Sequence, residues 1–356
     1  MKKTRLAISN TVKVLALSAT LLLNGGQAMA DVPSLTNPNL HKINEQVYAL
    51  IGDLNQQTVK NQGFNSNITF FITRSSVVVV DPGSSVRIGR MVIREIKKIT
   101  DKPVTHVINS HFHPDHWLGN QAFSELTPQP KIIAHPKMKA MAKKTSNRAI
   151  KRLNNMTQGA HADTKAVLPN TLVNGDEKLN IGGLTFEFIH PQHAHTNGDL
   201  LVYVPELKTI VTGDVFFNKR TPGLQHANTK GNAQALDMLM QLDIAHVIPG
   251  HGPITDKSGL NYMRNYLEVL YNEVNKYYAQ GFTDREMMDR IDVGKYREMS
   301  GFESRFPVNV NAMYQQVVKE AGYQLFLKQI GLTSGAEIEN ISSVNNDTKP
   351  DAQRFE

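Results

Sequence analysis

The chain has 356 residues, a formal net charge of +7, 40% hydrophobic residues and no cysteine. Without cysteine, disulfides cannot stabilise it, and thiolates are excluded both as metal ligands and as nucleophiles. Stability must therefore come from a sizeable core and from bound metal. Four of the positive charges and none of the negative ones fall in the first thirty residues, which leaves +3 for the rest. That balance is mildly basic and indicates no particular partner.

The first thirty residues have the pattern of a secretory signal peptide. An apolar run, Val14–Leu23, precedes the small residues of Ala28-Met29-Ala30, so we expect cleavage after Ala30 and a periplasmic or secreted protein. An uncleaved anchor is the alternative, but the run is shorter than the ~20 residues of a bilayer span. No second such run follows, so we expect no stable membrane insertion after cleavage. The basic residues at the start are Lys2, Lys3, Arg5 and Lys13.

The remaining chain is too long for one compact core, which predicts a large domain with a smaller one appended. Residues 31–255 have an α/β pattern, because short strands rich in Val, Ile, Leu and Phe alternate with turn signals and helical stretches. The expected strands are Thr69–Val80, Val104–Asn109, Lys131–Ala134, Leu184–Ile189, Leu200–Val204, Thr209–Thr212 and His246–Ile248.

From residue 256 the pattern changes to amphipathic helix. Apolar side chains recur at helical spacing from Leu260 to Tyr278 and again from Val310 to Val318. We therefore expect a C-terminal helical extension over residues 256–333. Residues 334–356 are polar with few large apolar groups, which predicts a disordered tail.

The most informative segment reads HFHPDH, from His111 to His116. Thr105–Asn109 precedes it and has the pattern of a buried strand, so the motif lies in a loop at the end of a sheet, where fold-supported sites are usually built. His111 and His113 can converge on one ion, while Asp115 and His116 follow around the turn and face a second position. A lone H-x-H is a weak signal, but H-x-H-x-D-H specifically indicates a metal site.

Further ligands must come from elsewhere, because histidine-rich zinc sites use about three protein ligands and keep an open position for water. Three candidates each follow an expected strand: His195 in HAHTNGDL, Asp214 in IVTGDVF and His251 in VIPGHGP. Gly213 lets the backbone turn directly after its strand. Loops at one edge of a sheet converge, so we expect these side chains to approach the HFHPDH motif.

The motifs HFHPDH, HAHTNGDL, VTGDVF and VIPGHG, in this order, resemble the metallo-β-lactamase superfamily over roughly residues 47–255. The resemblance implies an α/β fold, the four-layer αβ/βα sandwich, with its site at one edge of two central sheets. Asp81-Pro82-Gly83 resembles the early D-x-G turn of the family, which supports the metal loop from behind. The implied ligands are His111, His113 and His195 on one metal, Asp115, His116 and His251 on the other, and Asp214 bridging both.

Some features depart from the β-lactamases of this family. The cysteine ligand of many secreted members is missing, and Gly213-Asp214 instead resembles the bridging aspartate of glyoxalase-like thioester hydrolases and lactonases. The C-terminal helices, with the segment from Ser304 to Val310, resemble the exported branch called quinoprotein relay system zinc metallohydrolases. Antibiotic hydrolysis is therefore not the default prediction.

The predicted cofactor is zinc, two ions per chain, because histidine and carboxylate ligands suit it best; iron or manganese would also fit. Two ions roughly 3.5–4 Å apart can share a water and lower its pKa towards neutrality. The sequence thus predicts an exported dinuclear metallohydrolase whose metal-bridging hydroxide attacks a small-molecule ester, thioester, lactone or lactam. Asp115 would orient that hydroxide or relay its proton.

Two alternatives stay open. One is a mononuclear iron enzyme similar to persulfide dioxygenases, which would use half of the ligands. The other is a metal-holding accessory protein of a periplasmic redox or quinone pathway, without turnover. A nuclease of the same superfamily is disfavoured because export separates the chain from RNA, so we expect no nucleic-acid partner. The sequence does not specify the oligomeric state.

Two further segments bear on substrate access. The polar loop Asp53–Asn67 is expected to hang over the metals, either as a flap that contacts substrate or as an inert hairpin tip. A helix expected over Pro136–Gln158 has basic residues and no acidic one. A solvated face is the ordinary interpretation, and the alternative is a rim that steers acidic substrates or an anionic membrane surface towards the site. The basic residues are Lys137, Lys139, Lys143, Lys144, Arg148, Lys151 and Arg152.

Overall fold

The structure is a computed structural model that describes residues 38–329, which all belong to one compact unit. The expected signal peptide over residues 1–30 and the expected tail over residues 334–356 lie outside the described residues. Between residues 38 and 329, no helix is both long enough and apolar enough to cross a lipid bilayer. Export therefore stays a prediction.

The first sheet has seven strands in chain order, β1 to β7. Neighbours pair antiparallel from β1 to β4 and parallel from β4 to β7. Parallel neighbours need a crossover, and helices supply each one: α1 leads to β5, α2 and α3 lead to β6, and α4 leads to β7. The strands are β1 Leu40–Lys42, β2 Val47–Leu50, β3 Ile68–Ile72, β4 Val77–Val80, β5 Val104–Ile108, β6 Lys131–Ala134 and β7 Thr171–Leu172.

The second sheet has five strands in the order β12-β11-β10-β9-β8. Its first four strands in the chain form an antiparallel meander, and β12 returns parallel to β11 after the helix α5. The strands are β8 Lys178–Ile181, β9 Leu184–Ile189, β10 Leu201–Val204, β11 Thr209–Val211 and β12 His246–Ile248.

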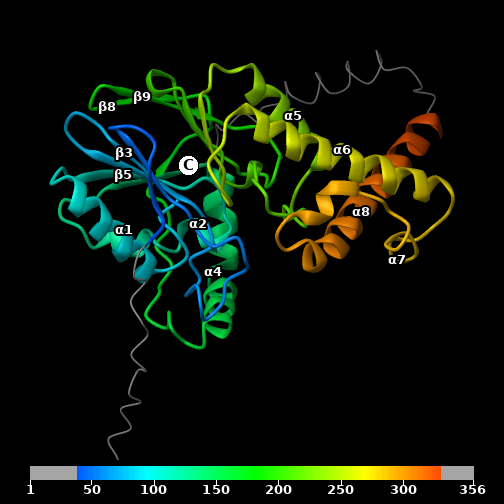
Figure 1. Cartoon of the computed structure of the whole chain (residues 1–356), viewed down its shortest axis with the longest axis horizontal. Coiled ribbons are helices and arrows are strands. Elements are labelled where there is room, and N and C mark those ends of the chain that lie inside the picture. The colour runs from blue at the N-terminus through cyan, green and yellow to red at the C-terminus, as the bar shows by residue number, and fades with distance from the viewer. Residues whose placement is uncertain (1–37, 330–356) are drawn as a thin grey trace, which may run out of the picture. The chain divides into compact units, whose positions relative to one another are not determined.

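The two sheets pack face to face and helices cover their outer faces, as Figure 1 shows. Strand β4 illustrates the layering: Val77 and Val79 join the core beneath α1, whereas Val78 and Val80 join the core between the sheets. Successive side chains point to opposite faces, and both faces are covered, so the strand is apolar throughout. A third core lies between the second sheet and α5, α6 and α8. The predicted αβ/βα four-layer sandwich is confirmed.

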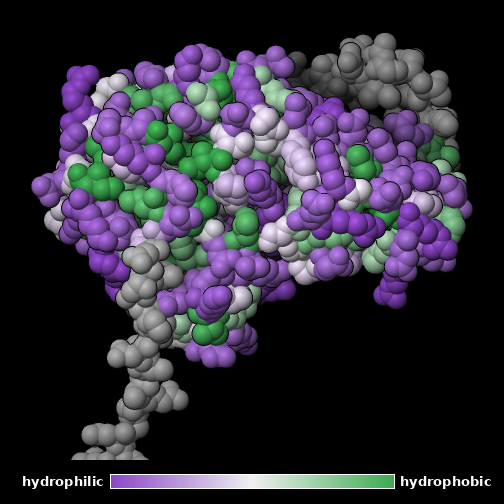
Figure 2. Space-filling model, viewed as in Figure 1, coloured by the Kyte–Doolittle hydropathy of each residue, from purple (hydrophilic) through white to green (hydrophobic). Residues whose placement is uncertain are grey.

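The C-terminal helices pack on the outer face of the second sheet. Leu260 and Tyr266 of α6 and Val310 of α8 share one core with Leu236 of α5 and Ile210 of β11. The first helix of the expected extension begins at Lys257, but the division into two domains stays a prediction. Figure 2 shows a mostly hydrophilic face, with apolar side chains gathered over the strands. The helices are α1 Val86–Ile99, α2 Pro114–Trp117, α3 Asn120–Ser124, α4 Pro136–Met156, α5 Thr229–Gln241, α6 Lys257–Ala279, α7 Asp284–Met287 and α8 Phe302–Gln329.

The expected single strand Thr69–Val80 was wrong, because the segment forms two strands. Strand β3 ends at Ile72, β4 begins at Val77, and Thr73 and Ser76 close the turn between them. The Thr73 N–H and Oγ1 both donate to the Ser76 carbonyl, at 2.8 and 2.9 Å. The turn contains neither glycine nor proline, the residues by which turns are usually recognised.

The loops that carry the predicted site residues meet where the two sheets adjoin. Strands β4 and β5 are parallel neighbours, as are β11 and β12, so each pair ends at one edge of its sheet. Asn67 joins the two edges, because its N–H donates to the Gly250 carbonyl at 2.8 Å and its Nδ2 donates to the carbonyls of Pro249 and Gly252. The site is therefore built on rigid strand ends.

We expect Gly119→Ala to destabilise the fold. A Cβ at Gly119 would lie 2.1 Å from the Pro82 carbonyl oxygen, and the Gly119 N–H donates to the Gly83 carbonyl at 2.8 Å. Such overpacking costs about 1–3 kcal/mol. Gly322→Ala in α8 is the control: a Cβ there meets nothing within 4 Å, so it should stabilise the helix by roughly 0.5–1 kcal/mol. Thermal unfolding followed by circular dichroism measures both, and equal midpoints would contradict the argument.

Candidate metal centre

The loop after β5 is locked by its own sequence. Pro114 occupies the first turn of α2, where its fixed φ favours helix and its missing N–H costs nothing. The fully buried Trp117 donates from Nε1 to the Phe112 carbonyl at 2.9 Å and so closes the loop from inside. As a result, His111 and His116 are both buried and point to the same side.

Four of the predicted ligands form a first cluster. His113 Nδ1 lies 2.9 Å from Nε2 of both His111 and His195. Asp214 Oδ2 lies 3.5 Å from His111 Nε2 and 3.4 Å from His195 Nε2. One ligand atom from each of the four residues falls within 4.8 Å of the others.

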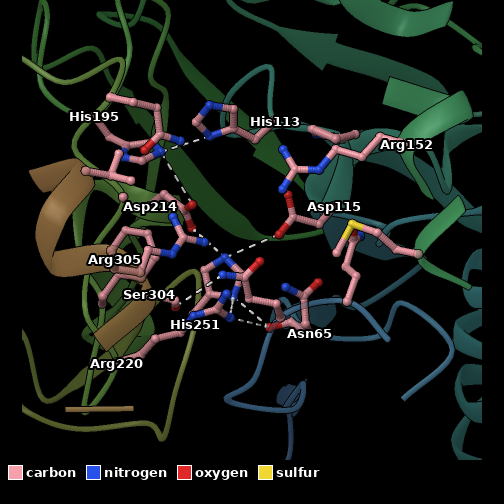
Figure 3. A pocket seen from close by; sticks show the side chains of 18 of the residues that line it. Asn65, His113, Asp115, Arg152, His195, Asp214, Arg220, His251, Ser304 and Arg305 are labelled. Atoms are coloured by element: carbon pink, nitrogen blue, oxygen red, sulfur yellow. Dashed lines mark hydrogen bonds and ion pairs between the residues drawn. The ribbon is translucent and has the colours of Figure 1, made fainter. Parts of the chain in front are cut away.

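The other three predicted ligands form a second cluster. His116 Nε2 lies 3.4 Å from His251 Nε2, and Asp115 Oδ2 lies 3.4 Å from His251 Nε2 and 3.9 Å from His116 Nε2. Asp214 also reaches this cluster, since its Oδ1 lies 3.1 Å from His116 Nε2 and 3.3 Å from His251 Nε2. The structure thus brings all seven predicted residues together, with one oxygen of Asp214 facing each cluster. Figure 3 shows His113, His195 and Asp214 of the first cluster and Asp115 and His251 of the second in the wall of a cavity.

The hydrogen bonds of His116 and His251 indicate whether cations fit between the clustered side chains. His116 Nδ1 donates to Asp81 Oδ2 at 2.8 Å, and His251 Nδ1 donates to the Asn65 carbonyl at 2.6 Å. In the neutral tautomers, both Nε2 atoms therefore present lone pairs to each other. Asp214 Oδ1 is buried without a hydrogen-bond partner. Lone pairs and carboxylate oxygens that converge in this way repel unless a cation lies between them, so the residues fit a pair of divalent ions. Their roles as ligands stay a prediction that this geometry supports.

Asp81 sets the ring orientation in both clusters. Its Oδ1 accepts from the Ser110 N–H at 2.7 Å, and its Oδ2 accepts from Ser110 Oγ at 2.7 Å as well as from His116. Because the Ser110 hydroxyl donates to Asp81, it accepts from His111 Nδ1 at 3.0 Å. Each cluster therefore contains a histidine whose Nε2 is directed inward, as outer hydrogen bonds to metal ligands usually ensure.

Two glycines make room for Asp214. Gly213 has φ +51°, and a Cβ there would lie 2.5 Å from Ser110 Oγ. A Cβ at Gly250 would lie 2.1 Å from Asp214 Oδ1. Side chains at either position would separate the strand ends that form the clusters, which explains why glycine stands in both motifs.

Comparison with known proteins identifies the family. The family model for the metallo-beta-lactamase superfamily matches residues 61–251, more than half of the chain. The chain belongs to the metallo-beta-lactamase superfamily. The matched region contains all seven clustered residues, and the superfamily is one of hydrolases. A hydrolase with a candidate site for divalent metal is therefore established at this level.

The individual relatives cover different shares of this chain. The linear primary-alkylsulfatase of Pseudomonas sp. (strain ATCC 19151) is 22% identical over 60% of the chain, which spans 48% of that relative's length. The structure of the inverting sec-alkylsulfatase Pisa1 from Pseudomonas sp. matches with TM-score 0.61 and 17% identity, over 86% of this chain and 56% of that one. A metallo-beta-lactamase from Pontibacter korlensis matches with TM-score 0.53 and 21% identity, over 64% of this chain and 98% of that one. These structures share the fold.

A cavity of about 360 Å³ lies over both clusters, and three arginines line it. Arg152 belongs to the basic helix for which the sequence offered a rim as one interpretation, whereas the roles of Arg220 and Arg305 were missed. Arg152 comes from α4, Arg220 from the segment after Asp214, and Arg305 from α8 (Figure 3). The loop Asp53–Asn67 contributes Gln56, Gln57 and Asn65 to the wall, so it lies over the clusters as predicted, although its action as a flap stays a prediction.

His226 is a second residue that sequence reasoning missed. Its Nδ1 lies 2.9 Å from His113 Nε2, so it accepts from that ring and directs His113 Nδ1 into the first cluster. It lies 31 residues beyond His195 in the segment QHAN, which has no ligand spacing that could have identified it. The nearby His193 contacts the His226 carbonyl rather than the clusters.

Burial and charge tune the imidazoles differently. Burial lowers the pKa of His113 and of His195 well below the usual range, so both rings are neutral near pH 7, as metal ligation requires. Burial acts in the same direction on His116, but the carboxylates of Asp214 and Asp81 outweigh it and raise its pKa well above the usual value. Without metal, His116 is therefore an imidazolium at neutral pH, and a second proton on Nε2, 3.1 Å from Asp214 Oδ1, takes the place of the cation.

The two carboxyl groups of the clusters stay ionised. Burial alone would raise the pKa of Asp115, but the neighbouring His116 and His251 outweigh it and hold the pKa at about 2. Burial likewise opposes the ionisation of Asp214, and the same two histidines lower its pKa well below the usual range. At neutral pH both groups are anionic and can only accept hydrogen bonds or bind cations.

We predict that zinc binding releases protons. Because the pKa of His116 is raised, its proton must leave before Nε2 can bind a cation, so affinity should rise with pH through the neutral range and fall on acidification. Calorimetric titration in two buffers of different ionisation enthalpy counts the protons. Asp81→Asn removes a charge that holds this proton, so it should release fewer protons and bind roughly 10–100-fold more weakly. Asp237→Asn on the surface of α5 is the control. A pH-independent affinity with no proton release would contradict the assignment.

Proposed function

We propose that the protein is a two-metal hydrolase of small anionic esters, with sulfuric monoesters as the favoured class. One observation carries the proposal: three arginines, Arg152, Arg220 and Arg305, line the same cavity as both clusters, and none forms an ion pair within residues 38–329. Guanidinium groups without carboxylate partners bind oxyanions in a geometry that matches their paired N–H donors. An anionic group beside the metals supplies the missing partner.

Arg220 is the most informative of the three because it is only 3% exposed. Its Nη1 lies 2.8 Å from His251 Nδ1 and 3.4 Å from the Asn65 carbonyl, but His251 Nδ1 already donates to that carbonyl and cannot accept. Burial lowers the pKa of Arg220 to about 10, so it stays charged at neutral pH. A buried cation with unused donors is costly, and a substrate anion would stabilise it.

The helical extension supplies Arg305. Ser300, just before α8, pairs with the segment around Arg220, since Thr221 N–H donates to its carbonyl and its own N–H donates to the Lys219 carbonyl, both at 3.0 Å. Gly223 leaves room for the guanidinium, because a Cβ there would lie 2.5 Å from Arg305 Nη1. The extension and the sandwich thus build one anion-binding wall.

The relatives support the same substrate class. Two of them are named as alkylsulfatases, and the match to Pisa1 covers 86% of this chain, a larger share than the β-lactamase match at 64%. The matched 86% is a larger share of the chain than residues 31–255 make up. The likeness to the alkylsulfatase therefore reaches into the extension that carries Arg305. The chain spans about half the length of these relatives, so their activity is only proposed here.

The residues divide the chemistry as follows. Two divalent cations held by the clusters would supply Lewis-acid activation of water and of the ester oxygen. Arg220 and Arg305 hold the anionic oxygens, and the ionised Asp115 accepts a hydrogen bond from the attacking water, a role that its low pKa favours over proton donation. Hydrolysis of a sulfuric monoester then releases an alcohol and hydrogensulfate.

The wider range of carboxylic esters, thioesters, lactones and lactams is the second proposal. The same two clusters serve any of these electrophiles, and β-lactams also carry a carboxylate that the arginines could bind. The fold shared with the Pontibacter β-lactamase supports it, but fold alone does not select a substrate.

We expect Arg305→Ala to lower kcat/KM for a short-chain alkyl sulfate by about 10–100-fold, because it removes charge-assisted hydrogen bonds to the ester anion. A neutral carboxylic ester of the same chain length should lose much less. Arg94→Ala on α1 is the control, since this arginine is exposed and does not line the cavity. Equal losses for the two substrates would contradict selective anion binding, and activity on the neutral ester alone would favour the second proposal.

We predict two zinc ions per purified chain, and a loss of the second ion together with turnover in His116→Ala. Elemental analysis beside steady-state rates measures both. One iron per chain with oxygen uptake would support the dioxygenase-like alternative instead. Full metal content without turnover on any ester, thioester, lactone or lactam would support a metal-holding accessory protein.

Export to the periplasm or beyond is proposed on the composition of residues 1–30 alone. A mature protein whose amino terminus is Asp31, found by sequencing the protein from cell fractions, is the expected result. An intact Met1 in the cytoplasmic fraction would contradict it.

A further inference from the structure

Helix α4 carries a stripe of cations along its outer side. Lys137, Lys144, Arg148, Lys151 and Arg152 are spaced by seven, four, three and one residues, so they fall on one face of the helix. The opposite face, with Met138, Ala142 and Leu153, is buried in the core around Trp117. The stripe therefore faces away from that core, and its last member, Arg152, reaches the metal cavity. Figure 1 shows α4 below the sheets.

No partner inside the described chain neutralises this stripe. All five residues are exposed, and none makes an ion pair or a side-chain hydrogen bond within residues 38–329. The helix has no acidic residue in its 21 positions. Most exposed cations of a protein alternate with anions, so a single-sign stripe of this length produces a local positive potential that attracts an anionic surface.

An apolar side chain lies exposed beside the Arg152 end of the stripe. Val308 of α8 is 45% exposed and lines the cavity together with Arg152 and Met156 of α4. The end of the stripe thus borders an exposed valine and the opening of the metal cavity.

We propose that this face, the stripe with Val308 beside its Arg152 end, docks on an anionic lipid bilayer. Lysines and arginines along a helix bind the charged headgroups, and the neighbouring valine enters the headgroup boundary. The helix contains no aromatic residue on which bases could stack, which disfavours single-stranded nucleic acid. Attachment is peripheral, and it places the opening of the cavity next to the bilayer. The inference goes beyond the proposed hydrolase and does not depend on its substrate.

Vesicle co-sedimentation tests the inference without any activity readout. The full chain should bind vesicles of phosphatidylcholine with phosphatidylglycerol, should bind pure phosphatidylcholine much less, and should be released by high salt. Lys144→Glu with Lys151→Glu should lower the partition coefficient at least about tenfold. The matched control is Arg94→Glu with Lys97→Glu on α1, two exposed cations on a helix that does not line the cavity, and it should bind nearly as the wild type does.

Two further arms make the result decisive. Lys144→Gln with Lys151→Gln should weaken binding in the same direction and replaces the reversal variant if that variant unfolds. Val308→Ser should lower binding without changing its salt dependence. Equal binding to both kinds of vesicle, an equal loss in the α1 control, or a preference for duplex DNA over anionic vesicles would overturn the proposal. Failure of sulfate-ester hydrolysis would leave these binding results unchanged, so the two proposals can fail separately.

Discussion

The buried carboxylate of Asp81 is the contact on which the site depends. It binds the Ser110 N–H and hydroxyl and His116 Nδ1, all at 2.7–2.8 Å, and through Ser110 it also determines the tautomer of His111. Its backbone adopts φ +56°, a left-handed conformation that aspartate tolerates better than most residues because its short polar side chain bonds locally. The turn after β4 thus directs one imidazole nitrogen into each cluster before any cation binds, which is how a fold pre-organises a metal site.

The second sheet and the extension complete what this turn begins. Asp214 and His251 follow the ends of strands β11 and β12, and the carboxylate of Asp214 faces both clusters. Arg220 follows on the same segment, and Ser300 ties the start of α8 to it, so Arg305 enters the same cavity. The extension is therefore part of the site as well as part of the core. A chain cut after residue 255 would keep the predicted ligands but would lose Arg305 and much of the core beneath α5.

Most of the candidate metal centre could be predicted from the sequence because its ligands lie in short segments of the chain. Ligand types cluster in short motifs, each motif follows a strand, and strand ends meet by topology, so His195, Asp214 and His251 could be placed beside HFHPDH before any coordinates. Arg220, Arg305 and His226 could not, because their contacts arise only from tertiary packing and their surroundings have no characteristic spacing. The turn at Thr73–Ser76 was not predicted for another reason. β-branched residues continue on both sides of it, and it contains no glycine or proline. Helix α4, with its strong boundary at Pro136, was placed to within two residues.

The buried Arg220 and the exposed cations of the α4 stripe differ in how they attract anions. Arg220 is desolvated and held at a fixed position, so its attraction for an anion is strong, geometrically selective and little affected by salt. The cations of the α4 stripe are exposed to solvent, so each contributes little, their effects add, and salt screens them over a Debye length of about 8–10 Å. Arg152 belongs to both sets, since it lies at the end of the stripe and lines the cavity. Ionic strength therefore acts as a physical switch between them: it should weaken attachment to an anionic surface while leaving the binding of a small soluble anion at the metals largely intact.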